Sequence, residues 1–221
     1  MSIVGQFALR PCAPTLGRVN LDASPPVAPP SATGLFRPTQ ADLVAARGRT
    51  IPDLVAPGLR VLFAGINPSL YSAATGHHFA RPGNRFWPAL HRSGFISRQL
   101  RPEEQPLLLS QGLGITNLVA RATARADELD TAELRAGGET LAELAGSLGV
   151  SWLAILGVTA YRAAFRAPSA VVGPQPGRLG GAQVWILPNP SGLNASWPLT
   201  RLAEAFQELR QTAYGEAGSD G

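Results

Sequence analysis

Short apolar runs alternate with amphipathic stretches along most of this chain. Four runs predict buried strands, at residues 61–64, 114–119, 152–157 and 184–187. Apolar residues at helical spacing predict helices over residues 39–47, 84–93, 101–110, 131–148 and 159–165, and over a last segment that begins at Pro198. Strands that alternate with helices indicate an α/β fold. We therefore expect a three-layer αβα domain with a central four-stranded, mostly parallel sheet.

Composition divides the chain into one domain and two tails. Residues 1–38 are rich in proline and lack periodicity, which predicts a flexible tail, and residues 214–221 predict a disordered tail. The 221 residues are 45% hydrophobic and 15% charged, so residues 39–213 can form one globular domain. The sequence contains neither an apolar run of about 20 residues nor a signal peptide pattern. A cytoplasmic protein without a membrane association is expected.

Residue usage excludes several chemistries. Cys12 is the only cysteine, so neither an intrachain disulfide nor a cysteine-ligated iron–sulfur cluster can form. All 19 basic residues are arginine, so no lysine is present to form a Schiff base. We interpret the adjacent His77 and His78 as partly exposed turn residues and not as metal ligands, because no cysteine or further histidine accompanies them. Neither a metal nor another cofactor is expected.

Charge adds one weak indication of a partner. The net charge is +4 and the isoelectric point is about 10.2. Arginines that neutralise phosphates release counterions, so this balance is compatible with a nucleic-acid partner. Ordinary solvation of a chain with arginine-biased codons explains the same charge without a nucleic-acid partner, so charge alone does not indicate one.

Two similar turns follow two of the predicted strands. The first strand leads into Gly65-Ile66-Asn67-Pro68-Ser69, and the fourth leads into Pro188-Asn189-Pro190-Ser191-Gly192-Leu193. In open α/β sheets, ligands bind in the crevice outside the carboxyl ends of parallel strands. The two turns are therefore expected to meet over one pocket.

These turns carry a resemblance when they are taken with two further segments, Thr75-Gly76-His77-His78-Phe79-Ala80-Arg81-Pro82-Gly83-Asn84-Arg85-Phe86-Trp87 and Ala136-Gly137-Gly138. Together they closely resemble the mismatch-specific uracil/thymine-DNA glycosylases, the Mug/thymine-DNA glycosylase family, over about residues 53–213. The resemblance implies a monomeric enzyme with a uracil-DNA-glycosylase-like fold that acts on double-stranded DNA. Such an enzyme flips uracil, or a related damaged or mismatched pyrimidine, and hydrolyses its N-glycosidic bond. The absence of lysine agrees with a monofunctional reaction that leaves an abasic site.

Roles for individual residues follow from the same resemblance. Asn67 matches the residue that positions the attacking water, and its amide cannot act as an effective general base. Phe79 matches the residue that stacks on the flipped base, while Ser72 matches a position beside C5 of that base. Backbone groups near Ile66 and Phe79 are implied to bind the polar edge of the base. The implied substrate-binding residues are Ile66, Pro68, Ser72, Phe79, Asn117 and Asn189.

A second set of residues is implied to contact the DNA. Leu193 matches a wedge that fills the space left by the flipped base and offsets part of the cost of unstacking. Its neighbours contact the opposite guanine mainly through backbone groups. The implied DNA-binding residues are Ser191, Gly192, Leu193 and Asn194.

Three residues depart from the family pattern. Ser69 stands where a glycine is common, Asn117 where close relatives have lysine, and Asn194 where they have serine. An amide at Asn117 can both donate to and accept from a flipped base without a positive charge. We hypothesise that the substrate range is less dependent on an opposite guanine than in those relatives.

Two other functions stay open at this point. A DNA-lesion-binding protein with the same fold and little or no catalysis would explain the pocket and the wedge, although Asn67 argues against it. An α/β protein that binds free nucleobases or nucleotides would explain the pocket but gives no reason for the Leu193 wedge.

Overall fold

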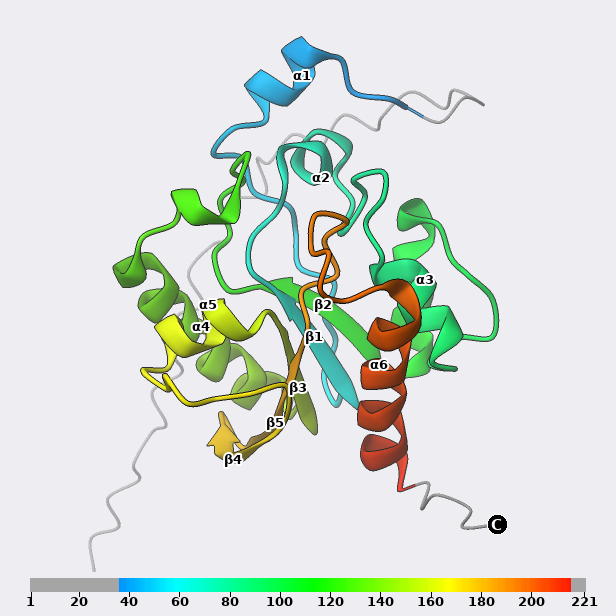
Figure 1. Ribbon diagram of the computed structural model, residues 1–221, viewed down its shortest axis with the longest axis vertical. Helices are drawn as coiled ribbons and strands as arrows, with labels where there is room; N and C mark the ends of the chain where they lie inside the picture. Colours follow the sequence, from blue (N-terminus) through cyan, green and yellow to red (C-terminus); the bar gives the residue numbers. More distant parts are fainter. Residues whose placement is uncertain (1–35, 216–221) are drawn as a thin grey trace, which may run out of the picture. The chain divides into compact units, whose positions relative to one another are not determined.

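The computed structural model describes residues 36–215 and contains a central sheet with strand order β2-β1-β3-β5-β4 (Figure 1). The sheet is parallel except for β4, which pairs antiparallel with β5. The α/β class and the mostly parallel sheet are therefore confirmed, but the sheet has five strands and not four. Of the tails predicted at residues 1–38 and 214–221, residues 1–35 and 216–221 lie outside the described residues. The strands are β1 (Val61–Gly65), β2 (Leu113–Asn117), β3 (Trp152–Leu156), β4 (Gly173–Leu179) and β5 (Ala182–Leu187).

The additional strand, β4, occupies a segment that the sequence predicts to be an irregular connection. It contains Pro174, Pro176 and Gly177, residues that are usually excluded from the middle of a sheet. At an edge, a proline can face away from the only neighbouring strand. The pairing with β5 also shifts between Gln175 and Arg178, so the ladder is interrupted around Pro176. This edge position explains why the composition was misleading.

Most predicted helices are present with small changes at their ends. Thr39 and Asp42 form the predicted capping box of the first helix. A short helix that the sequence did not predict follows Ser69, whose side chain accepts a hydrogen bond from the Ser72 amide. The predicted helix over residues 101–110 is a 3₁₀ helix, η1, which contains Pro106. The α-helices are α1 (Gln40–Ala45), α2 (Leu70–Thr75), α3 (Phe86–Arg92), α4 (Thr131–Leu148), α5 (Val158–Ala164) and α6 (Leu199–Tyr214), and the 3₁₀ helices are η1 (Pro102–Gln111) and η2 (Ala126–Glu128).

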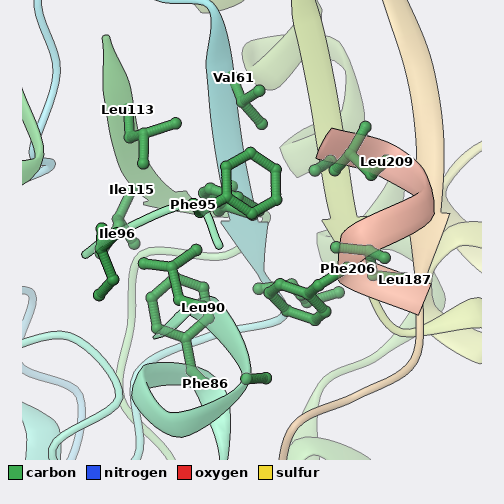
Figure 2. Packing of buried hydrophobic residues seen from close by; sticks show 14 of the residues in the cluster. Val61, Phe86, Leu90, Phe95, Ile96, Leu113, Ile115, Leu187, Phe206 and Leu209 are labelled. Atoms are coloured by element: carbon green, nitrogen blue, oxygen red, sulfur yellow. The ribbon is translucent and has the colours of Figure 1, made fainter. Parts of the chain in front are cut away.

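Helices cover both faces of the sheet. Helices α3 and α6 lie on one face, and α4 and α5 lie on the other (Figure 1). Along β1, Val61 and Phe63 point into the first hydrophobic cluster and Leu62 and Ala64 into the second, as expected for a strand buried on both faces. Figure 2 shows the first cluster, in which aromatic and aliphatic side chains fill the space between the sheet and α3 and α6. None of the helices in residues 36–215 is long and apolar enough to cross a bilayer.

Helix α4 approaches the end of β2 through a glycine. A Cβ atom built on Gly137 would overlap the backbone carbonyl of Leu118, well inside van der Waals contact. Glycine in a helix interior is less favourable than alanine by about 1 kcal/mol. The cost of Gly137 in the helix is offset because the missing side chain lets α4 pack closely against the backbone of Leu118.

We expect Gly137→Ala to destabilise the protein by about 1–2 kcal/mol, although alanine is the better helix former. The obstacle is a backbone carbonyl, so α4 itself must move. Urea unfolding followed by circular dichroism measures the change. Thr140→Ala, at an exposed position of the same helix, is the control and should be neutral or slightly stabilising. A Gly137→Ala protein as stable as wild type would show that α4 can shift without cost.

Candidate active site

A cavity of about 430 Å³ opens at the carboxyl ends of β1, β2 and β5. Both Asn-Pro turns contribute to it, so the prediction that they share one pocket is confirmed. Gly192 and Asn194, two of the predicted DNA-binding residues, do not line the cavity. The predicted site residues that do line it are Ile66, Asn67, Pro68, Ser72, Phe79, Asn117, Asn189, Ser191 and Leu193.

The amide of Asn67 is held in one orientation. Its Nδ2 donates hydrogen bonds to the backbone oxygen of Arg121 at 3.0 Å and to Oγ1 of Thr123 at 2.7 Å. The hydroxyl of Thr123 itself donates to the backbone oxygen of Arg125 at 2.7 Å, so its oxygen accepts from Asn67. A carbonyl can only accept, which fixes the amide nitrogen on this side. Among residues 36–215 no group donates to Oδ1 of Asn67, and because Asn67 lines the cavity this atom can accept a hydrogen bond from a water molecule there.

Thr123 is a site residue that the sequence analysis missed. Thr123 is buried, and its backbone amide donates to the oxygen of Pro68 at 3.2 Å. This bond joins residues 121–125 to the first Asn-Pro turn. Residues 121–125 are also attached to α4, because Arg121 pairs with Glu133 at 2.5 Å between Nε and Oε1. Hydrogen bonds from Arg121 lower the pKa of Glu133 to about 2, so the pair stays charged at neutral pH. Nothing in the local sequence distinguishes Thr123 from other loop threonines.

Phe79 presents a flat ring at the cavity. Its ring stacks on the fully buried ring of Phe86, with centroids 4.1 Å apart and an interplanar angle of 23°. The backbone of Phe79 has a φ of 53°, an uncommon left-handed conformation for a residue other than glycine. The next amide, Ala80, donates to the hydroxyl of the buried Ser72 at 3.2 Å. These contacts fix one face of the ring against Phe86 while the residue lines the cavity.

Gly65 provides space where β1 ends. It pairs with Asn117 in the parallel ladder between β1 and β2. A Cβ atom on Gly65 would lie 2.6 Å from Oδ1 of Asn117 and 3.3 Å from the Phe79 ring. The glycine therefore allows both side chains to lie over the strand end. This requirement was not predicted, because it depends on contacts between residues far apart in the chain.

Residues 190–197, which we call the wedge loop, connect β5 to α6 at the carboxyl end of the sheet (Figure 1). Leu193, which the resemblance predicts to be the wedge, is 77% exposed. Oδ1 of Asn189 accepts from the Ser191 amide at 2.9 Å, and Nδ2 of Asn194 donates to the backbone oxygen of Asn189 at 3.0 Å. The side chains of both asparagines therefore stabilise the fold of this loop.

His78 differs from the prediction. It is 2% exposed, and its Nε2 lies 3.0 Å from the backbone oxygen of Pro52, while the interpretation as a partly exposed turn residue holds only for His77. Burial is the main cause that lowers the pKa of His78, so the ring is neutral and donates from Nε2. The backbone of His78 is also bonded on both sides, since its amide donates to Oε1 of Gln105 at 2.9 Å and its oxygen accepts from Nε1 of Trp87 at 3.2 Å.

This burial predicts a loss of stability in mild acid. The unfolded chain binds a proton at His78 near pH 6.5, whereas the folded protein resists protonation until lower pH. Stability is therefore retained above about pH 6.5 and falls below it. We expect the thermal midpoint to decrease between pH 7 and 5.5, and His78→Gln to remove part of this decrease. The control His91→Gln, at the end of α3, should retain the full decrease. An equal decrease of the thermal midpoint in all three proteins would contradict the assignment of this pH dependence to His78.

The cavity mouth also carries charged groups. Arg125 and Asp127 both line it and pair with each other, at 2.6 Å between Nη2 and Oδ2. Hydrogen bonds from Arg125 lower the pKa of Asp127, which is therefore ionised at neutral pH and a weak base. In residues 36–215, no group of three or more His, Cys, Asp or Glu side chains could hold a metal ion.

Comparisons with known proteins agree with this geometry. The family model of the uracil DNA glycosylase superfamily matches residues 52–210, which include every residue that lines the cavity except Ile51. A solution structure from Methanosarcina acetivorans, of a protein named as a candidate uracil DNA glycosylase, is similar with a TM-score of 0.50. The two chains are 18% identical, and the similarity covers 74% of this chain and 98% of the other, which bears on the fold alone. On the family match, this chain belongs to the uracil DNA glycosylase superfamily.

Proposed function

We propose that this protein removes uracil, or a related damaged or mismatched pyrimidine, from double-stranded DNA, as the Mug/thymine-DNA glycosylase branch of the superfamily does. The observation that carries the proposal is the amide of Asn67, whose nitrogen is occupied by two acceptors and whose oxygen is free at the cavity. A group in this position can hold a water molecule but cannot take its proton effectively. That combination suits hydrolysis in which the base departs before the water is fully deprotonated.

The proposed reaction begins with extrusion of the nucleotide from the duplex. Leu193 enters the stack and fills the vacated space, which offsets part of the cost of flipping. The extruded base stacks on Phe79, where a flat apolar surface accepts several bases with little discrimination. The backbone near Ile66 and Phe79 binds the polar edge of the base, and Ser72 lies beside its C5 atom.

Bond cleavage then separates charge. The sugar becomes oxocarbenium-like while the base leaves as an anion, which the preorganised dipoles of the pocket stabilise. Water held by Oδ1 of Asn67 adds to the anomeric carbon, releases its proton to solvent, and leaves an abasic site. The chain has no lysine that could attack this carbon, so the DNA strand stays intact.

Base release from labelled duplexes tests the proposal. The substrates are U:G, U:A and T:G duplexes and a single-stranded uracil oligonucleotide, each assayed with excess enzyme. Release from at least one uracil substrate supports a glycosylase and ranks its lesions. Tight binding of uracil duplexes with no release from any substrate would instead support the lesion-binding alternative.

The amide at Asn117 leads to a prediction on the opposite base. It lies at the carboxyl end of β2 beside Gly65 and lines the cavity, so it can bond to the flipped base itself. We expect release from U:G and U:A to differ by less than about fivefold, which corresponds to about 1 kcal/mol. Asn117→Lys should increase the preference for U:G. Activity confined to U:G and other mispairs in the wild type would contradict this prediction.

A further inference from the structure

We propose that Arg85 is a positioning residue that holds the wedge loop in the form that enters DNA. The inference rests on the proposed function, because it assigns Arg85 a part in extruding the base. It follows from hydrogen bonds that connect the beginning of α3 to the wedge loop, which lies more than 100 residues further along the chain.

One guanidinium contacts the wedge loop at three points. Nη1 of Arg85 donates to the backbone oxygen of Trp197 at 2.6 Å, and Nη2 donates to the oxygen of Asn194 at 2.9 Å and to that of Ser191. The backbone amide of Arg85 adds a fourth bond, to the oxygen of Pro190 at 2.9 Å. These acceptors include the first and last residues of the loop. A planar fork of donors is the side chain best suited to holding several carbonyls in a fixed arrangement.

The hydrophobic core fixes the position of Arg85 at the beginning of α3. Arg85 immediately precedes Phe86 and Trp87, which are 0% and 3% exposed in the first hydrophobic cluster. The side chain of Asn84 accepts a hydrogen bond from the Phe86 amide at 2.9 Å, which fixes the turn before α3. The Arg85 backbone is therefore held by the core next to Pro190, and its side chain extends from there to the rest of the loop.

The wedge loop also packs directly against the segment before Arg85. A Cβ atom on Gly192 would lie 2.7 Å from the backbone oxygen of Gly83. Leu193 follows Gly192 and extends to solvent, 77% exposed, so apolar packing in the free protein does little to hold it. Its placement therefore depends on the backbone of the loop, and Arg85 binds that backbone on both sides of Leu193.

Electrostatics agree with this role. Within residues 36–215, no carboxylate forms an ion pair with Arg85, and its charge is balanced by the dipoles of the three carbonyls. A positive charge that no carboxylate neutralises therefore lies against the backbone of the wedge loop, the loop proposed to contact DNA. A loop ordered in advance loses less entropy on binding than one that orders on the duplex.

The test compares duplex with single-stranded substrate. Arg85→Met keeps an apolar stem but removes the donors, and we expect it to slow release from a U:G duplex about tenfold under single-turnover conditions. Release from single-stranded uracil, which requires no wedge, should change less than about twofold. Arg85→Lys, which can reach fewer carbonyls, should fall between Arg85→Met and wild type. Arg92→Met removes the same charge from the exposed end of α3 and should resemble wild type.

A double-mutant cycle with Leu193→Ala tests whether Arg85 acts through the wedge. If it does, adding Arg85→Met to Leu193→Ala should slow duplex release by less than about twofold further. Equal losses on duplex and single-stranded substrate, or losses that multiply in the double variant, would overturn the inference. A wild type that releases no base would contradict the proposed function instead. In that case hydrogen exchange tests whether Arg85 orders the wedge loop. The backbone amides of the loop should exchange at least about tenfold faster in Arg85→Met, and unchanged exchange would refute this role of Arg85.

Discussion

Asn67→Ala is expected to slow base release from a U:G duplex by about 100-fold or more while changing DNA affinity less than about threefold. The substitution removes Oδ1, the acceptor that would hold the attacking water. It also removes the Nδ2 donor to Arg121 and Thr123, but Thr123 lines the cavity, where a water molecule can replace the lost donor. Because the stacking ring and the wedge are unchanged, the loss should fall on the chemical step.

Single-turnover kinetics with saturating enzyme separates this step from binding, and fluorescence anisotropy measures affinity for the same duplex. Ser110→Ala, on an exposed side chain of η1, is a control that should match wild type in both assays. An Asn67→Ala protein with more than a third of the wild-type rate would mean that another group positions the water. Asp127 would then be the first residue to test, because it is the carboxylate that lines the cavity in the described part of the chain.

Phe79→Ala is expected to lower kcat/KM for duplex uracil by about 10- to 100-fold. Stacking of a base on an aromatic side chain contributes about 1–3 kcal/mol, and Phe79 supplies the phenyl ring that lines the cavity among the described residues. The alanine variant also exposes the ring of Phe86, which could stack on the base only from about 4 Å further away. Phe86 should therefore be a poor substitute for Phe79 as the stacking partner of the base.

Phe79→Tyr is the matched control because it keeps the flat ring, and it should remain within about threefold of wild type. The thermal midpoint of both variants must be measured, since the Phe79 ring also packs on the core. An alanine variant that melts earlier but retains its kcat/KM would show that the ring serves only packing. A loss of kcat/KM at unchanged stability would support stacking.

Apolar runs made the four parallel strands predictable. Strands such as β1 and β3 are buried on both faces and therefore appear as short continuous hydrophobic stretches. The helix α4 was predicted with its observed ends from apolar residues at helical spacing. In the structure, Asp130 caps its start and Gly149 ends it in a left-handed conformation. In contrast, β4 was hidden by its prolines, and α2 is too short for a periodic pattern to develop.

The pocket was predictable to the extent that its residues lie in the two Asn-Pro turns. Its supporting contacts were not, because they join residues far apart in the sequence. Thr123 reaches Asn67 across 56 residues, and Arg85 reaches Trp197 across 112. Neither local propensity nor periodicity carries information on such pairs. The burial of His78 was missed for the same reason, since its partner Pro52 precedes it by 26 residues.

The most direct test of the account is the identity of the products formed from a U:G duplex. Wild-type protein is incubated with the duplex, free base is measured by chromatography, and the strand is analysed with and without alkali. We expect free uracil and an intact strand that breaks only after alkali treatment, with both signals strongly reduced in Asn67→Ala. No free uracil, or strand breaks that form without alkali, would contradict a monofunctional glycosylase.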